Sequence, residues 1–226
     1  MREDFCLESS RITHHVSDQF STSMTFIRFL DHWLFGAINS QAGQWPWLDR
    51  LARLLLNDYF VPTVLALMLL ALWFEQKNLP GLKDREGLKN YNRQAVLTAS
   101  LSAALANALL KIINLLYFRP RPFAGHAVNL LFYRPSDSSF PSNAAALGFA
   151  IAAGVWFYNR AWGWGLLALA ALFGLSRILG GVHYPFDVLA GAVLGWGSAW
   201  LIRRQQRLVE KLLGLIEKTA GRWGLA

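Results

Sequence analysis

Cysteine is almost absent from this sequence, because Cys6 is the only one among 226 residues. A disulfide within the chain is therefore excluded, and the Cys/His spacing of a zinc site is missing. Charged residues are also scarce, at 16% of the chain. No glycine-rich loop of the Walker type is found. These absences exclude a disulfide-stabilised domain and a P-loop enzyme.

Long apolar runs are what the sequence has instead, since hydrophobic residues make up 54% of it. A membrane-spanning helix needs about 20 mainly apolar residues. Ten Trp and fifteen Phe residues are typical of a protein whose aromatic side chains lie at membrane interfaces. The sequence predicts an all-α, polytopic membrane helix bundle with five spans, at residues 57–74, 94–118, 142–158, 161–179 and 185–202.

Polar segments flank the predicted membrane domain, which we place at residues 24–202. Residues 1–23 form a polar tail that lacks the apolar stretch of a signal peptide. Residues 203–226 are basic and amphipathic, as expected of a helix on anionic lipid. The chain is thus expected to contact membrane lipids at its surface as well as in its spans.

An apolar stretch at residues 24–40 is interrupted by Arg28, Asp31 and His32. Three ionisable residues in a short run are costly in the membrane interior. We therefore interpret this stretch as an amphipathic helix at the interface, with a sixth span as the alternative.

Basic residues outnumber acidic ones, 22 to 14, which gives a net charge of +8. They concentrate in the loop 75–93, at Arg160 and in the tail from residue 203. Five spans put all three on one side, which the positive-inside rule makes cytoplasmic. The loops 119–140 and 177–187 then lie together on the outer face. This pattern predicts an integral protein of a bacterial inner membrane with its site facing the periplasm, and no nucleic-acid partner.

The stretch 176–187 carries Arg177, His183 and Asp187 between two apolar runs. His183 and Asp187 are four residues apart, and Pro185 favours the first turn of a helix there. A carboxylate that holds one histidine nitrogen leaves the other free to act as a nucleophile. Arg177 offers a planar cation suited to phosphate. The alternative is a capped helix end with a structural Arg–Asp pair.

Two further patches are predicted on the same face. Arg119 and Arg121 follow the second span, and Ser142 and Asn143 open the third. Backbone N–H groups at a helix start bind anions, and the Ser142 hydroxyl adds a donor. Together the patches predict a phosphate pocket with a nucleophile, and neither a metal nor another cofactor is required.

At these residues the chain resembles the type 2 phosphatidic acid phosphatase family, whose superfamily includes the vanadium haloperoxidases. Three elements resemble the third family signature in residue type and in spacing: Ser176–Arg177, His183 and Asp187. Arg121–Pro122 resembles the end of the first signature, and Pro141–Ser142 the start of the second. The resemblance covers residues at three membrane boundaries in the family order.

The resemblance implies a six-helix membrane core and a phosphohistidine mechanism. His183 would attack phosphorus while Asp187 orients it. Arg121, Ser142 and Arg177 would hold the equatorial oxygens, on which charge develops.

The sequence departs from the family pattern at two positions. Asn114 stands where the first signature has lysine, although Lys111, one helical turn earlier, is a candidate phosphate contact. Ala144 stands where the second signature has the histidine that protonates the leaving group. His126 is the candidate replacement acid. General acids contribute about 10²–10⁴ in rate, so the second departure matters more.

The missing acid favours one class of substrate. An alkoxide leaving group, with a conjugate acid near the pKa of water at about 15.7, needs a proton. A phosphate leaving group, with a pKa of about 6, departs without one. We therefore expect a lipid diphosphate such as undecaprenyl diphosphate, with phosphate transfer to another lipid as an alternative. The other interpretations are a degenerate member that binds phospholipid without turnover, and a transporter or purely structural membrane protein.

Overall fold

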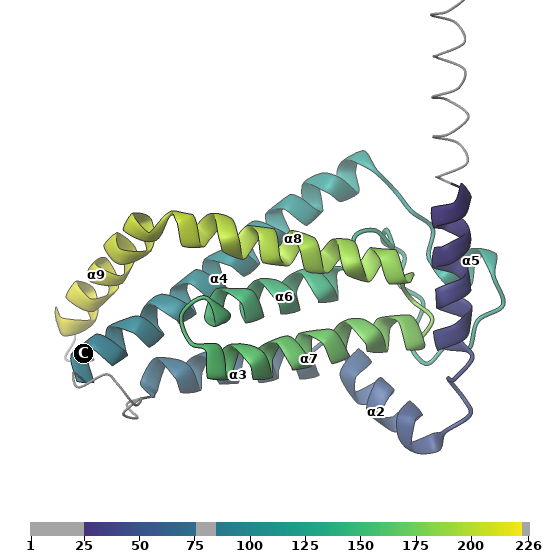
Figure 1. Ribbon diagram of the computed structural model, residues 1–226, viewed down its shortest axis with the longest axis horizontal. Coiled ribbons are helices and arrows are strands. Elements are labelled where there is room, and N and C mark those ends of the chain that lie inside the picture. Colours follow the sequence, from purple (N-terminus) through teal and green to yellow (C-terminus); the bar gives the residue numbers. More distant parts are fainter. Residues whose placement is uncertain (1–24, 76–84, 223–226) are drawn as a thin grey trace, which may run out of the picture.

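The computed structural model describes residues 25–75 and 85–222, and every regular element in these ranges is a helix (Figure 1). The all-α prediction is therefore confirmed. The predicted polar tail at residues 1–23 lies outside the described residues. The longer helices form a bundle whose members run side by side, namely α3 (Phe60–Phe74), α4 (Arg85–Leu116), α6 (Asn143–Trp156), α7 (Arg160–Leu179) and α8 (Pro185–Arg204).

Helix α6 is the centre of the bundle, with α4, α7 and α8 packed around it. Ten of its fourteen residues are buried, most of them Ala or Gly. Small side chains let neighbouring backbones approach closely, which is the usual basis of helix packing in membranes.

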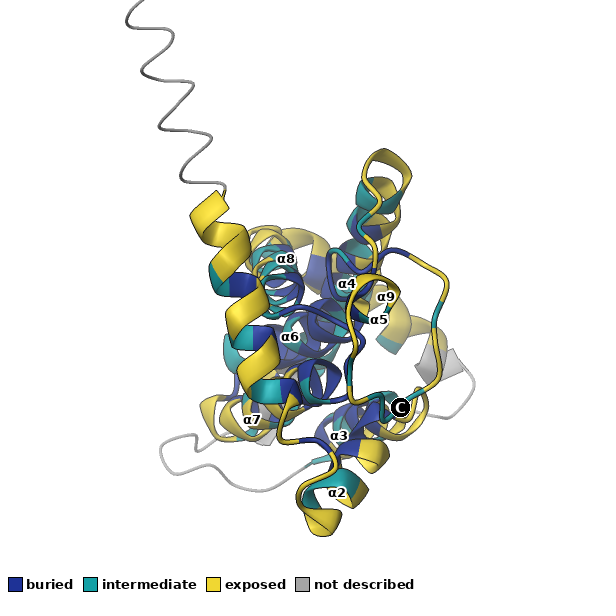
Figure 2. Cartoon of the chain, turned by 90° about the vertical axis from the view of Figure 1, so that its right-hand side faces the viewer, coloured by how far each residue is buried: buried dark blue, intermediate teal, exposed yellow. Residues whose placement is uncertain are grey.

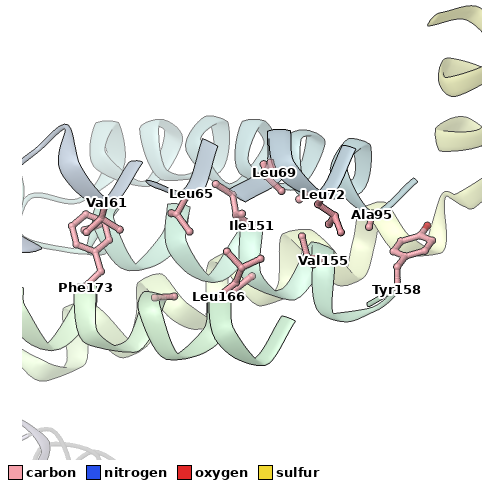
Figure 3. Packing of buried hydrophobic residues seen from close by; sticks show 14 of the residues in the cluster. Val61, Leu65, Leu69, Leu72, Ala95, Ile151, Val155, Tyr158, Leu166 and Phe173 are labelled. Carbon is pink, nitrogen blue, oxygen red and sulfur yellow. The ribbon is translucent and has the colours of Figure 1, made fainter. Parts of the chain in front are cut away.

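Helix α3 supplies a row of large apolar side chains to the main core cluster. The row follows one helical face at spacings of three and four residues. Figure 3 shows it directed toward α6 and α7, and its members pack with partners on those helices: Val61, Leu65, Leu69 and Leu72 with Ile151, Val155, Leu166 and Phe173.

Three described helices are long and apolar enough to cross a membrane: Tyr91–Leu116, Arg160–Leu179 and Pro185–Arg204. The pair α2 (Pro46–Leu56) and α3, bent by 64°, counts as a fourth if it is one span. Helix α6 has 14 residues, or about 21 Å, which is shorter than an average span. The sequence predicts apolar runs over all of these helices except α2, whereas the count of five spans stays a prediction.

The contact between α6 and α8 depends on two glycines of α8. A Cβ atom on Gly191 would lie 2.4 Å from the carbonyl oxygen of Ser142, and one on Gly195 would lie 2.4 Å from that of Ala146. Both distances are too short for any side chain. The first turns of α6 and α8 are thereby held together, and the N–H of Ser142 donates to the carbonyl of Asp187 at 2.9 Å.

The two ends of the bundle differ in character. At one end α9 (Gln206–Arg222) returns to α4, where Arg93 pairs with Glu217 at 2.7 Å. At the other end a helix of residues 25–39 lies across the bundle axis (Figures 1 and 2). Its orientation resembles an interfacial helix more than another parallel span. Figure 2 looks onto this second end, where the loops after α4 and α7 meet.

Candidate active site

A cavity of about 360 Å³ lies where the α2–α3 bend, the loop before α6 and the end of α7 meet. Four residues predicted for the site, Arg121, Asn143, Arg177 and His183, line it together. The stretches 119–140 and 177–187 therefore share one face, as the sequence predicts. The other lining residues are Asp58, Pro62, Phe132, Tyr133, Pro135, Asp137, Ala144, Leu147 and Phe173.

His183 is buried, and both of its ring nitrogens have partners. Its Nδ1 atom lies 2.8 Å from the carbonyl oxygen of Ser139, and its Nε2 atom lies 3.1 Å from Nη1 of Arg121. A guanidinium only donates, and a carbonyl only accepts. The contacts therefore require a neutral ring with its proton on Nδ1, which leaves the Nε2 lone pair available for nucleophilic attack.

The surroundings of His183 also disfavour its charged form. Burial, followed by the positive charge of Arg121, lowers the pKa of His183 well below its ordinary value of 6.5, against the opposing hydrogen bond to Ser139. A depressed pKa keeps the imidazole unprotonated around neutral pH. This is the protonation state that a nucleophilic histidine needs.

Asp187 is fully buried behind His183, but the expected direct hydrogen bond between them is not formed. Its Oδ2 atom lies 3.9 Å from Nδ1 of His183. Pro185 does open α8, and the Asp187 carboxylate turns back to accept the N–H of Tyr184 at 2.9 Å. The same oxygen accepts the hydroxyl of Ser139 at 2.5 Å. Asp187 thus reaches the histidine mainly through Ser139, because the start of the helix uses its carboxylate.

Arg121 enters the cavity wall from the start of α5 (Pro122–Gly125). Its Nε atom donates to the carbonyl of Asp137 at 3.1 Å and its Nη1 atom to that of Val182 at 3.0 Å. Its Nη2 atom pairs with the Asp137 carboxylate at 2.9 Å. Because the Asp137 side chain is 61% exposed, this carboxylate is free to move aside for an anion.

Arg177 comes from the last turn of α7 and lies near the rings of Phe132 and Phe173. Its Nη2 atom is 3.5 Å from Asp58, a carboxylate at the α2–α3 bend that is 42% exposed. Its Nε atom is buried without a hydrogen-bond partner among the described residues. Arg177 thus brings a permanent cation to the cavity wall while one of its donors stays unsatisfied by the described residues.

The start of α6 contributes backbone and side chains in different ways. Asn143 and Ala144 line the cavity. Ser142 is fully buried as the N-cap, with its hydroxyl accepting the N–H of Ala145 at 3.5 Å. Capping uses only a lone pair of the hydroxyl, so the predicted role of Ser142 as a phosphate donor stays a prediction.

Three other predicted residues lie away from this cavity. Arg119 pairs with Asp187 and Asp31, and Lys111 is exposed on α4. His126 lines a second cavity of about 490 Å³, with its ring centroid 4.9 Å from that of His32. Helix α5 is a single turn that ends before His126, so the chain carries this side chain toward the N-terminal helix. His126 is therefore not placed to act as the replacement acid.

Four site residues were missed from the sequence: Asp31, Asp58, Asp137 and Ser139. Asp31 had a visible signal, since a carboxylate in an apolar stretch needs a partner. The other three lie outside the apolar helices, where such residues are common. Within residues 25–75 and 85–222, no cluster of three or more His, Cys, Asp or Glu side chains could hold a metal ion.

An apolar helical bundle with a cavity holding two arginines and a buried histidine defines a membrane enzyme of phosphate chemistry. Residues 95–210, about half of the chain, match the PAP2 superfamily, and the chain belongs to that family. It is a membrane lipid phosphatase of this class.

Relatives along most of the chain agree with this assignment. The undecaprenyl-diphosphatase BcrC of Bacillus subtilis is 30% identical over 187 residues, covering 83% of this chain and 90% of that protein. The crystal structure of Aquifex aeolicus LpxE matches with a TM-score of 0.53 and 28% identity, covering 77% of this chain and 95% of LpxE. The PAP2-type phosphatidylglycerolphosphate phosphatase from Bacillus subtilis shares the fold, with a TM-score of 0.55 and 22% identity over 80% of this chain and 86% of its own.

Proposed function

We propose that this protein hydrolyses a lipid diphosphate of the undecaprenyl type through a phosphohistidine on His183. The observation that carries the proposal is Ala144, which lines the same cavity as His183 and both arginines. The resemblance leads us to expect a proton-donating histidine at that position. A site with a nucleophile and phosphate-binding cations, but with alanine in place of the acid, suits a leaving group that needs no proton.

In the first step, the Nε2 lone pair of His183 attacks the terminal phosphorus. The bond from that phosphorus to the bridging oxygen breaks, and the lipid monophosphate leaves with the electron pair. Its pKa of about 6 makes it a stable anion at neutral pH. Arg121 and Arg177 neutralise the charge that develops on the transferred group.

In the second step, water attacks the phosphohistidine, the N–P bond breaks, and inorganic phosphate is released. The Nδ1–H···O=C bond to Ser139 holds the ring in one orientation through both steps. An acceptor lipid hydroxyl in place of water would give phosphate transfer, which is the second candidate function. It needs the same residues, because only the incoming oxygen differs.

The orientation of the site is part of the proposal. The cavity is formed at one end of the bundle. The opposite end holds Arg160 and the basic residues of α9. The positive-inside rule places that basic end in the cytoplasm. The cavity would then face the periplasm of a bacterial inner membrane. The name of the relative BcrC supports the choice of undecaprenyl diphosphate as the substrate to test first.

Phosphate release by the purified protein in detergent is the test. Undecaprenyl diphosphate, undecaprenyl phosphate and phosphatidic acid are compared without divalent metal, with His183→Ala as the control. We expect release from the diphosphate that His183→Ala abolishes. Faster release from either monophosphate would overturn the substrate assignment. Formation of undecaprenyl phosphate and a phosphorylated acceptor lipid, without free phosphate, would identify a transferase. Binding without either reaction would identify a degenerate member.

A further inference from the structure

The N-terminal helix reaches the candidate active site through Asp31. This helix exposes Phe26, Phe29 and Trp33, yet the Asp31 side chain is only 2% exposed. A buried carboxylate is costly unless its oxygens are paired. Here both are used: Oδ2 binds Nη2 of Arg119 at 2.6 Å, and Oδ1 accepts the N–H of Phe186 at 2.9 Å. Asp31 thus fastens the first turn of α8 as well as an arginine.

Arg119 joins Asp31 to Asp187. One terminal nitrogen binds Asp187 at 2.5 Å while the other binds Asp31, and the guanidinium lies 4.2 Å from the Tyr184 ring centroid. The planar fork of arginine allows one residue to hold two carboxylates in fixed directions. With both ends occupied, Arg119 is a bridge within the protein rather than a phosphate ligand.

The contacts continue from Asp187 to the histidine. The Oδ1 atom of Asp187 is held by Arg119, which leaves Oδ2 for the hydroxyl of Ser139 at 2.5 Å. The carbonyl of Ser139 then accepts Nδ1 of His183 at 2.8 Å. An unbroken set of hydrogen bonds therefore runs from the N-terminal helix to the nucleophile, along residues Asp31, Arg119, Asp187, Ser139 and His183.

We propose that Asp31 is a positioning residue for His183, acting through Arg119 and Asp187. The residue lies outside the region 95–210 that matches the family, so the N-terminal helix becomes part of the active site. Without the Asp31 charge, Arg119 loses one of its two anchors and the Asp187 carboxylate loses its fixed direction. The ring of His183 is then held less firmly. The kinetic part of this proposal rests on the proposed function, whereas the structural part does not.

Asp31→Asn is the informative variant, because asparagine keeps an oxygen for the N–H of Phe186 while removing the charge that binds Arg119. Small misplacement of a reacting group costs up to about 10²-fold in rate. We expect kcat to fall about 10-fold to 100-fold with KM nearly unchanged, since Arg121 and Arg177 are untouched. Arg28→Gln, an exposed change one turn earlier in the same helix, is the matched control and should leave both constants unchanged.

A double variant tests the path. If Asp31 acts through Arg119, then Asp31→Asn combined with Arg119→Gln, which removes the cation, should be no slower than Arg119→Gln alone. Additive losses would show that Asp31 acts by another route and would overturn the proposal.

Nitrogen-15 NMR of the histidines gives a readout that does not need turnover. The His183 signals are assigned by their loss in His183→Gln. We expect the Nδ1–H proton of His183 to exchange faster with water in Asp31→Asn than in the wild type or in Arg28→Gln. An unchanged His183 spectrum together with unchanged kcat would overturn the proposal, as would lower thermal stability with kcat retained. If the wild type releases phosphate from no lipid, the proposed function fails, and the His183 spectra still decide the role of Asp31.

Discussion

Nη1 of Arg121 lies 3.1 Å from Nε2 of His183, so the arginine proposed to bind phosphate is hydrogen-bonded to the atom proposed to attack phosphorus. In the free enzyme this contact holds the Nε2 lone pair of His183 in one direction. An incoming phosphoryl group offers the same N–H donor a charged oxygen, which is a stronger acceptor. In the proposed mechanism, substrate binding would therefore free the Nε2 lone pair as the phosphorus arrives beside it.

The first prediction concerns the pKa of His183. Burial and the charge of Arg121 both disfavour the imidazolium, so His183 should remain neutral as the pH falls through 6.5 and should gain a proton only well below that value. Arg121→Gln removes the second cause and should move the pKa upward, toward 6.5. The measurement is a nitrogen-15 NMR titration of His183, in which Arg160→Gln, at the opposite end of α7, should change nothing. A wild-type pKa at or above 6.5 would contradict the prediction.

The second prediction restores the missing acid. Ala144 lines a cavity of about 360 Å³, which has room for an imidazole. Ala144→His should raise the hydrolysis of a lipid monophosphate by about 10²-fold or more, since that leaving group needs a proton. Hydrolysis of the diphosphate should change little. Ala144→Gln, of similar size but without acid function, is the control, and an equal gain in both variants would refute the explanation.

Much of the bundle could be predicted because apolar runs report helices directly. The five predicted runs coincide with α3, α4, α6, α7 and α8 to within a few residues at most ends. The start of α4 is the main exception. The helix begins at Arg85, nine residues before the predicted run, and its polar first turns were missed because they carry no apolar signal. The bend between α2 and α3 was not predicted, and the predicted span began at residue 57, inside it.

Arg121, Arg177 and His183 could be predicted as site residues. Each lies near the end of an apolar run, and together they follow the order of the family signatures. The site was missed where partners are remote in the sequence. Asp31 lies 155 residues from Phe186, and no local pattern encodes such a contact. The acceptor for His183 is a backbone carbonyl, which the identity of Ser139 does not reveal. Arg119 and Arg121 differ in role for the same reason, because packing alone decides which guanidinium faces the cavity.

The third prediction treats Asp58 as a competitor of the substrate. It pairs with Arg177 at 3.5 Å across the cavity wall and is 42% exposed. Pairs this exposed contribute up to about 1 kcal/mol, so Asp58→Asn should lower KM about twofold to fivefold by freeing the arginine. Inhibition by inorganic phosphate should strengthen by a similar factor. The control is Asp49→Asn on α2, whose carboxylate accepts the N–H of Gly43 and no other hydrogen bond from the described residues, and it should leave both values unchanged. A higher KM in Asp58→Asn would instead make Asp58 part of substrate binding.

The fourth prediction concerns the contact that holds α6 and α8 together near the site. A Cβ atom at Gly191 would lie 2.4 Å from the carbonyl oxygen of Ser142, so Gly191→Ala must push the two helices apart. Overpacking of this kind costs about 1–3 kcal/mol, and it should lower the thermal unfolding midpoint in detergent by several degrees. Gly197→Ala, on the same helix with no atom within 4 Å of its added methyl group, is the matched control. Because the N–H of Ser142 donates to the carbonyl of Asp187, separating the helices should also reduce kcat at temperatures where the protein is still folded. Equal stability and activity in the two variants would mean that this close approach is not required for the site.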